Sequence, residues 1–219
     1  MIKILAGGPK ENWPADLFVN KNDDDIWIGI DYGAYALVNN GILPKKIVGD
    51  FDSLNSQQKN QLFNQIDQVD IVQVDSHKDE TDTELALEVA REFLDAHQEI
   101  IVYGASGGRL DHELSNLTIF AKENLRDLVG KVILIDSQNK ISYYTEGEHQ
   151  IKRDPNYKYL AFMNITPVTN FEIIDALYQL SAVDNDFPLM YPSNEFADNI
   201  VNFKLDQGIM MVILSKDKA

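Results

Sequence analysis

Hydrophobic and polar residues follow two different patterns along the chain. From residue 1 to about residue 135, short apolar runs are separated by longer segments with an apolar face at helical spacing. This alternation is typical of successive strand and helix units in a parallel sheet. The apolar runs predict strands at residues 2–5, 26–30, 46–48, 71–74, 100–103 and 132–135.

Three of the intervening segments have the spacing of a helix that buries one side. The clearest covers residues 81–95, where Leu85, Val89 and Phe93 belong to one apolar stripe. Residues 111–124 form a second candidate. Residues 32–39 form a third, and Gly41 follows them as a residue that commonly ends helices. We therefore expect an α/β domain over residues 1–138.

The second half of the chain has the pattern of an antiparallel sheet. After about residue 136, short runs of β-branched and aromatic residues are separated by turn-forming clusters. These runs predict strands at residues 140–145, 159–164, 171–174, 200–204 and 209–215. We expect residues 139–219 to form a small sandwich or barrel-like domain.

The composition argues against several classes of protein. A formal net charge of -16 makes nucleic acid and anionic membranes poor partners, because both bind patches of Lys and Arg. The chain has no cysteine, so disulfides and thiolate metal sites are excluded. It contains neither the apolar run of a signal peptide nor the roughly 20 apolar residues that span a bilayer. We therefore expect a cytoplasmic protein without a membrane segment.

Acidic residues gather directly after four of the predicted strands. These strands lead into Asp31, into Asp50-Phe51-Asp52, into residues 77–82 and into residues 107–112. Ligands bind at the carboxyl edge of open parallel sheets, so these loops should meet in one crevice. An extended Asp50-x-Asp52 segment would send both carboxylates to the same side. Carboxylates so close repel each other unless a cation lies between them, and their oxygens suit Mg²⁺ bound with substrate phosphates.

Some of these residues also have a purely structural explanation. Thr81-x-x-Glu84 is a capping box, and Asp31 can simply begin the next helix. Gly107-Gly108-Arg109 is consistent either with a loop that receives an anion or with an ordinary turn. His112 suggests proton transfer or a phosphate contact, although it can equally be a surface residue at a helix start.

Several sequence blocks together resemble the signature of the thiamine pyrophosphokinase family. The blocks are residues 49–53, residues 78–84, and residues 107–112 with Asn116. Residues 193–196 resemble the short block of the thiamine-binding domain in that family. The resemblance is strongest from Asp31 to Asn116. It departs where the family often has Asp-Gly-Gly and this chain has Asp31-Tyr32-Gly33.

The resemblance implies a fold, a reaction and an assembly. It implies a Rossmann-like parallel-sheet catalytic domain that binds ATP and Mg²⁺, a C-terminal all-β sandwich domain that binds thiamine, and a homodimer with active sites between subunits. The implied reaction moves the β,γ-pyrophosphoryl group of ATP to the hydroxyl of thiamine, which gives thiamine diphosphate and AMP. A metal-dependent nucleotide or phosphate-ester hydrolase and a non-catalytic ATP or thiamine sensor are the alternatives.

The resemblance also implies a role for each site residue. The metal ligands are Asp31, Asp50, Asp52 and Asp82; the catalytic residues are Asp50, Asp52, Asp82 and Asp111; the nucleotide and its phosphates contact Thr81, Asp79, Arg109, His112 and Asn116; and thiamine contacts Asp31, Ser193 and Asn194.

Overall fold

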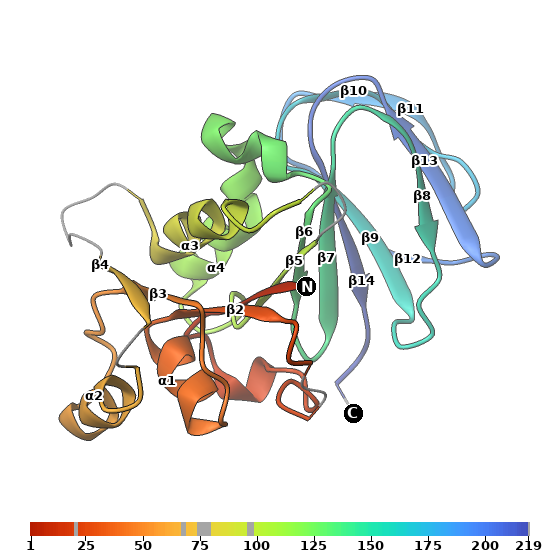
Figure 1. Cartoon of the computed structure of the whole chain (residues 1–219). Coiled ribbons are helices and arrows are strands. Elements are labelled where there is room, and N and C mark those ends of the chain that lie inside the picture. The colour runs from red at the N-terminus through yellow and green to blue at the C-terminus, as the bar shows by residue number, and fades with distance from the viewer. Residues whose placement is uncertain (20–21, 67–68, 74–79, 96–98, 219) are drawn as a thin grey trace. The chain divides into compact units, whose positions relative to one another are not determined.

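The computed structural model describes residues 1–19, 22–66, 69–73, 80–95 and 99–218, and it divides into two compact units. The first contains Met1–Leu117 and Ile135–Ser137, and the second contains Thr118–Leu134 and Gln138–Ala219. The fold is mixed α/β with a β-rich C-terminal part (Figure 1). Within the described ranges, no helix is both long enough and apolar enough to cross a membrane.

The first unit is built on five parallel strands in the order β5-β1-β2-β3-β4. The apolar runs of β1, β2, β3 and β5 are largely buried on both faces, as in β1, where every residue is buried, and this explains why the sequence predicts them well. Strand β4 lies at the end of this strand order and exposes Ile71. Val74, which the sequence places in the fourth strand, lies outside the described residues. The strands are β1 (Ile2–Leu5), β2 (Ile26–Ile30), β3 (Lys46–Gly49), β4 (Asp70–Gln73) and β5 (Ile100–Tyr103).

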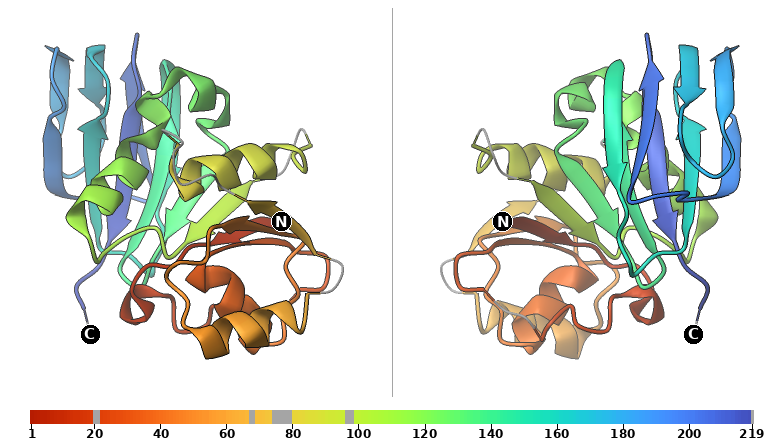
Figure 2. Two further views of the ribbon diagram at one scale, coloured as in Figure 1. Left: turned by 90° about the vertical axis from the view of Figure 1, so that its left-hand side faces the viewer. Right: turned by 90° about the vertical axis from the view of Figure 1, so that its right-hand side faces the viewer.

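Helices cover both faces of this parallel sheet. Helices α1 (Tyr32–Asn39) and α2 (Ser56–Phe63) lie on one face, and α3 (Asp82–Arg91) lies on the other (Figure 2). Helix α3 is shorter than the predicted 81–95 and buries Ala86, Leu87, Val89 and Ala90. Helix α4 (Leu110–Thr118) is also shorter than predicted, because the chain continues as 3-10 turns at Ile119–Ala121 and Glu123–Leu128.

The sequence gives no indication of α2. This helix buries only Leu62, so it lacks the apolar stripe on which the prediction depends. A capping box begins it instead: the Asn55 side chain accepts from the Gln58 N–H, and the Gln58 side chain accepts from the Asn55 N–H, both at 3.0 Å.

The second unit consists mainly of antiparallel strands in two sheets. The strand orders are β12-β9-β14-β7-β6 and β11-β10-β13-β8. Side chains of both sheets share one apolar core, in which the ring centroid of Phe162 lies 5.7 Å from that of Phe171 and 5.2 Å from that of Phe203. The strands are β6 (Val132–Ile135), β7 (Asn139–Tyr144), β8 (Gly147–Lys152), β9 (Tyr159–Asn164), β10 (Val168–Ile173), β11 (Leu180–Asn185), β12 (Met190–Glu195), β13 (Ile200–Leu205) and β14 (Met210–Ser215).

Strands β8, β11 and β12 are absent from the sequence prediction. Each buries at most one side chain, and most of their other residues are polar or exposed. Backbone pairing with neighbouring strands defines them, and hydrophobic alternation cannot detect such strands.

Candidate active site

Three segments of the first unit bring carboxylates together at the carboxyl edge of its sheet. Asp31 follows β2, Asp50 and Asp52 follow β3, and Asp82 is the first residue of α3. The Asp31 and Asp82 side chains share a hydrogen bond. The charge of Asp50 acts on both of them, and that of Asp52 acts on Asp82. These four residues, which come from distant parts of the sequence, therefore form one electrostatic cluster.

A strained backbone positions Asp31 within this cluster. Asp31 has φ 45 and Phe51 has φ 61, conformations that are uncommon for residues other than glycine. Oδ1 of Asp31 accepts the Phe51 N–H at 3.0 Å, and the Asp31 N–H donates to the Val48 carbonyl at 3.1 Å. Gly49, at φ 133, passes so close that a Cβ there would lie 2.1 Å from Asp31 Oδ1. Glycine is therefore required at position 49.

The segment that carries Asp50 and Asp52 is a turn, so the prediction of an extended conformation is wrong. Oδ1 of Asp50 accepts the Asp52 N–H at 3.0 Å, and this contact closes the turn. The physical reason lies at Phe51, whose side chain is buried beside Phe63 with ring centroids 5.4 Å apart. With Phe51 turned into the core, both flanking carboxylates are exposed to solvent.

Burial and mutual repulsion make this cluster retain protons. Burial raises the pKa of Asp31 to about 7, the Phe51 N–H opposes that rise, and the charges of Asp82 and Asp50 add to it. Burial also raises the pKa of Asp82, while its hydrogen bond from Asp31 opposes the increase. The Asp31–Asp82 pair therefore holds a proton more readily than two isolated carboxylates would.

The described residues do not contain three His, Asp or Glu side chains arranged closely enough to form a complete metal site. The cluster nevertheless fits a hard divalent cation chemically. It consists of carboxylate oxygens, which such cations prefer, and it holds a proton where a cation would relieve the repulsion.

Thr81 begins α3 as its N-cap, which is the role that the predicted capping box gives to this residue. The Thr81 hydroxyl accepts the Glu84 N–H at 3.3 Å and so caps the helix. An electrostatic interaction with His112 lowers the pKa of Asp82, so α4 also faces this region. Asp79 lies outside the described residues.

A glycine-rich loop connects β5 to α4. Gly107 and Gly108 have φ 79 and φ 81, so both have left-handed backbone conformations. Beyond them, Arg109 and Asp111 form a two-pronged ion pair, with Nη2 2.6 Å from Oδ2 and Nε 3.2 Å from Oδ1. Both side chains are exposed, at 73% and 63%, so a phosphate can replace Asp111 as the partner of the guanidinium.

Asn116 faces the same loop from within α4. Its Nδ2 donates to the Ala105 carbonyl at 2.8 Å. The Asn116 amide therefore supports the loop backbone, and its predicted contact with the nucleotide stays a prediction.

Ser193 and Asn194 line a cavity of about 480 Å³ in the second unit. Strand β12 is irregular between Tyr191 and Asn194, and Ser193 has φ 59. This irregularity turns the buried Asn194 side chain onto the backbone of Tyr178, where it accepts from the N–H at 3.0 Å and donates to the carbonyl at 2.7 Å. The cavity also presents Tyr178, Met190 and Tyr191, a surface suited to a flat aromatic ligand.

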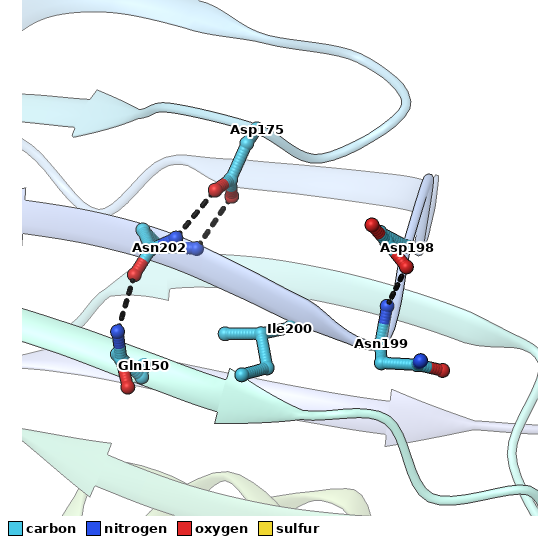
Figure 3. Close-up of a pocket in the computed structure, with 6 residues that line it drawn as sticks. All are labelled: Gln150, Asp175, Asp198, Asn199, Ile200 and Asn202. Atoms are coloured by element: carbon cyan, nitrogen blue, oxygen red, sulfur yellow. Dashed lines mark hydrogen bonds between the residues drawn. The ribbon is translucent and has the colours of Figure 1, made fainter.

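A second concave region of this unit is lined mainly by polar and acidic side chains (Figure 3). Its polar side chains bond to one another: Gln150 Nε2 donates to Asn202 Oδ1 at 2.9 Å, and Asp175 accepts from both the side chain and the N–H of Asn202. Asp198 accepts the Asn199 N–H at 2.8 Å. These contacts explain the polarity of the region without a ligand.

Sequence reasoning missed several residues around the carboxyl edge of the sheet. Lys10 places its ammonium group 4.7 Å from the centroid of the Tyr32 ring, which lies between Trp13 and Tyr35. Tyr32 therefore packs against other aromatic side chains and also holds a cation at its face. The sequence signals here were Tyr32 in Asp31-Tyr32-Gly33 and the glycines Gly7-Gly8, which follow β1 after Ala6.

A family model described as "Thiamin pyrophosphokinase, catalytic domain" matches residues 19–129. A curated thiamine pyrophosphokinase of Bacillus subtilis (strain 168) is 32% identical, and the alignment covers 99% of each chain. The matched range includes the carboxylate cluster and the glycine-rich loop.

Solved structures give the same result for the fold. A Lactobacillus plantarum protein has a TM-score of 0.90 at 37% identity, with 99% of each chain covered. A thiamin pyrophosphokinase family protein of Enterococcus faecalis has a TM-score of 0.87 at 34% identity, again with 99% of each chain covered. Both units of the chain therefore have counterparts in these relatives.

Proposed function

Because the chain belongs to the thiamin pyrophosphokinase family, we infer that it transfers the β,γ-pyrophosphoryl group of ATP to the hydroxyl of thiamine. The products are thiamine diphosphate and AMP. The observation that carries this conclusion is the full-length relationship to a thiamine pyrophosphokinase, together with a carboxylate cluster inside the matched catalytic range. The parallel strand order, in which β1 lies between β2 and β5, supports a Rossmann-like description of the first unit.

We propose that Asp31, Asp50, Asp52 and Asp82 hold Mg²⁺ together with the triphosphate. The raised pKa values of Asp31 and Asp82 support this assignment, because they mark a place where positive charge is favoured. When bound, Mg²⁺ would neutralise phosphate charge and orient the reacting groups. The chain's own part is to fix the carboxylates, which it does through the strained turns at Asp31 and Phe51.

The residues after β5 are proposed to contact the phosphates. The exposed Arg109 guanidinium can exchange Asp111 for a phosphate oxygen and so neutralise charge that develops during transfer. His112 acts electrostatically on Asp82, and we propose that it contacts a phosphate. Thr81 and Asp79 complete the proposed nucleotide site, and Asp111, once released from Arg109, would orient the attacking hydroxyl.

Thiamine is proposed to bind through Ser193 and its neighbours in the second unit. A cavity with aromatic and thioether side chains suits the pyrimidine and thiazolium rings, and the net charge of -16 favours a cation. Residues 1–138 would then supply ATP binding and chemistry, and residues 139–219 would supply the thiamine site. We also propose a homodimer with active sites between subunits, which predicts that a protein that is monomeric in sedimentation would be inactive.

The test is AMP formation from ATP in the presence of Mg²⁺, measured with and without thiamine. Transfer to thiamine requires AMP to appear only when thiamine is present, in equal amount to thiamine diphosphate. AMP or phosphate release without thiamine would indicate a hydrolase. Tight binding of ATP or thiamine without AMP release would indicate a sensor, and either outcome would overturn the proposal.

A further inference from the structure

A buried serine in the glycine-rich loop is tied to a carboxylate that the reaction scheme above does not use. Ser106 is 8% exposed, and its Oγ donates to Asp136 Oδ2 at 2.6 Å. Asp136 directly follows β6, 30 residues further along the chain. A hydroxyl-to-carboxylate hydrogen bond of this length is charge-assisted and stronger than one between neutral groups.

The same loop is fixed at two further points on its buried side. The Gly8 N–H donates to the Gly104 carbonyl at 2.9 Å. The Asn116 amide donates to the Ala105 carbonyl at 2.8 Å. Residues 104, 105 and 106 therefore each make a hydrogen bond that holds the loop. Gly104 and Ala105 are held through their backbone carbonyls, and Ser106 is held through its side chain.

The other half of the loop has a different environment. Gly107 is partly exposed, and Gly108 and Arg109 are fully at the surface. Two successive glycines lose more backbone entropy on ordering than any other pair, so this half needs a firm attachment if its N–H groups are to keep one orientation. The bond between Ser106 and Asp136 lies immediately before the first of these glycines.

We propose that Asp136 is a positioning residue: through Ser106, it holds the loop of residues 107–109 in the conformation that receives the phosphates of ATP. This inference rests on the proposed function and assigns to it a residue outside the carboxylate cluster. Asp136 does not contact substrate in this scheme. Its effect is to order the loop before binding, so its loss should weaken nucleotide binding more than thiamine binding.

The experiment compares Ser106→Ala, Ser106→Thr and Asp136→Asn with the wild type. Binding of α,β-methylene-ATP is measured by calorimetry, and KM is measured separately for ATP and for thiamine. Ser106→Ala should weaken nucleotide binding and raise KM for ATP by about 10-fold, on the order expected for losing a hydrogen bond to a charged group. KM for thiamine should change less than about 2-fold. Ser106→Thr keeps the hydroxyl and should restore nucleotide binding, and Asp136→Asn should lie between wild type and Ser106→Ala.

A double variant and a control separate this role from a general loss of stability. If the two residues act as one unit, Ser106→Ala combined with Asp136→Asn should weaken nucleotide binding no more than the stronger single variant. Asp154→Asn alters a partly buried carboxylate that closes a turn in the second unit, and it should lower Tm without changing KM for ATP.

Two results would overturn the proposal. The first is a Ser106→Ala variant with a lowered Tm but wild-type affinity for α,β-methylene-ATP. The second is full additivity in the double variant. A wild-type protein that forms no thiamine-dependent AMP would instead refute the proposed function, and the calorimetric comparison would still decide whether Asp136 orders the loop.

Discussion

Replacing Asp31 by asparagine should stabilise the protein above neutral pH while reducing its activity. Burial raises the pKa of Asp31 from 3.8 to about 7, so the folded protein keeps a proton that the unfolded chain releases. The stability that this proton contributes is complete below pH 4, declines as pH rises, and is lost above pH 7. Asparagine is neutral at every pH and removes this dependence.

The size of the effect follows from the pKa difference. About 3 pKa units correspond to about 4 kcal/mol as an upper limit. Because the Asp31 side chain is only partly buried, solvent screening reduces this contribution to the unfolding free energy. We expect a total change of about 2 kcal/mol between pH 4 and pH 8. The substitution keeps the local contacts: Oδ1 of asparagine can accept the Phe51 N–H, Nδ2 can donate to Asp82, and asparagine tolerates a positive φ.

The assay is urea unfolding between pH 5 and pH 8 without divalent cations, followed by fluorescence of Trp13 and Trp27 in the first unit. Part of the change lies below pH 5, so across this range the unfolding free energy of the wild type should fall by about 1 kcal/mol more than that of Asp31→Asn. Asp111→Asn makes the same change of charge at an exposed carboxylate whose pKa is lowered by its hydrogen bond from Arg109, so it should keep the wild-type slope. Equal slopes for wild type and Asp31→Asn would refute the reasoning.

Mg²⁺ at pH 8 should stabilise the wild type more than Asp31→Asn if the cluster binds it.

Three further changes test the site. Gly49→Ala would place a Cβ 2.1 Å from Asp31 Oδ1, so we expect a loss of about 2 kcal/mol or more in urea unfolding and a fall in turnover that added Mg²⁺ does not reverse. Asp52→Asn should lower turnover by about 10²–10³-fold at saturating Mg²⁺, and near-normal turnover would contradict the metal-binding role proposed for it. Asn194→Ala removes both contacts to the Tyr178 backbone and should raise KM for thiamine with KM for ATP unchanged; an equal change in both would show that the residue serves only stability.

Several strands, most of them in the first unit, could be predicted closely because each is an almost continuous apolar run. The predicted bounds of β1, β2, β5 and β6 agree with the structure. Prediction failed where a helix or strand buries few side chains, as in α2 and β11. Such elements depend on capping or on backbone pairing with a neighbour, and neither leaves a hydrophobic period in the sequence.

The candidate site was predictable only in part. The position of Asp31, Asp50 and Asp82 after strands or at a helix start was enough to place them at one edge of the sheet. Their detailed geometry was not, because it depends on contacts between distant residues, such as the 20 positions that separate Asp31 from Phe51. The link from Ser106 to Asp136 spans 30 positions and was invisible for the same reason.

The apolar core beneath the carboxylates explains how an unfavourable arrangement persists. Left-handed conformations at Asp31 and Phe51 cost about 1–3 kcal/mol each, and the burial of Asp31 among like charges adds to that. Burial of the Phe51 side chain contributes about 2–3 kcal/mol in return, and the hydrogen bond from its N–H ties Asp31 to the same turn. The buried Phe51 and the acidic Asp31 are therefore held in place together. A chain that folds this way already has in place the carboxylates that we propose to face the phosphates, so ordering them is a cost of folding and not of substrate binding.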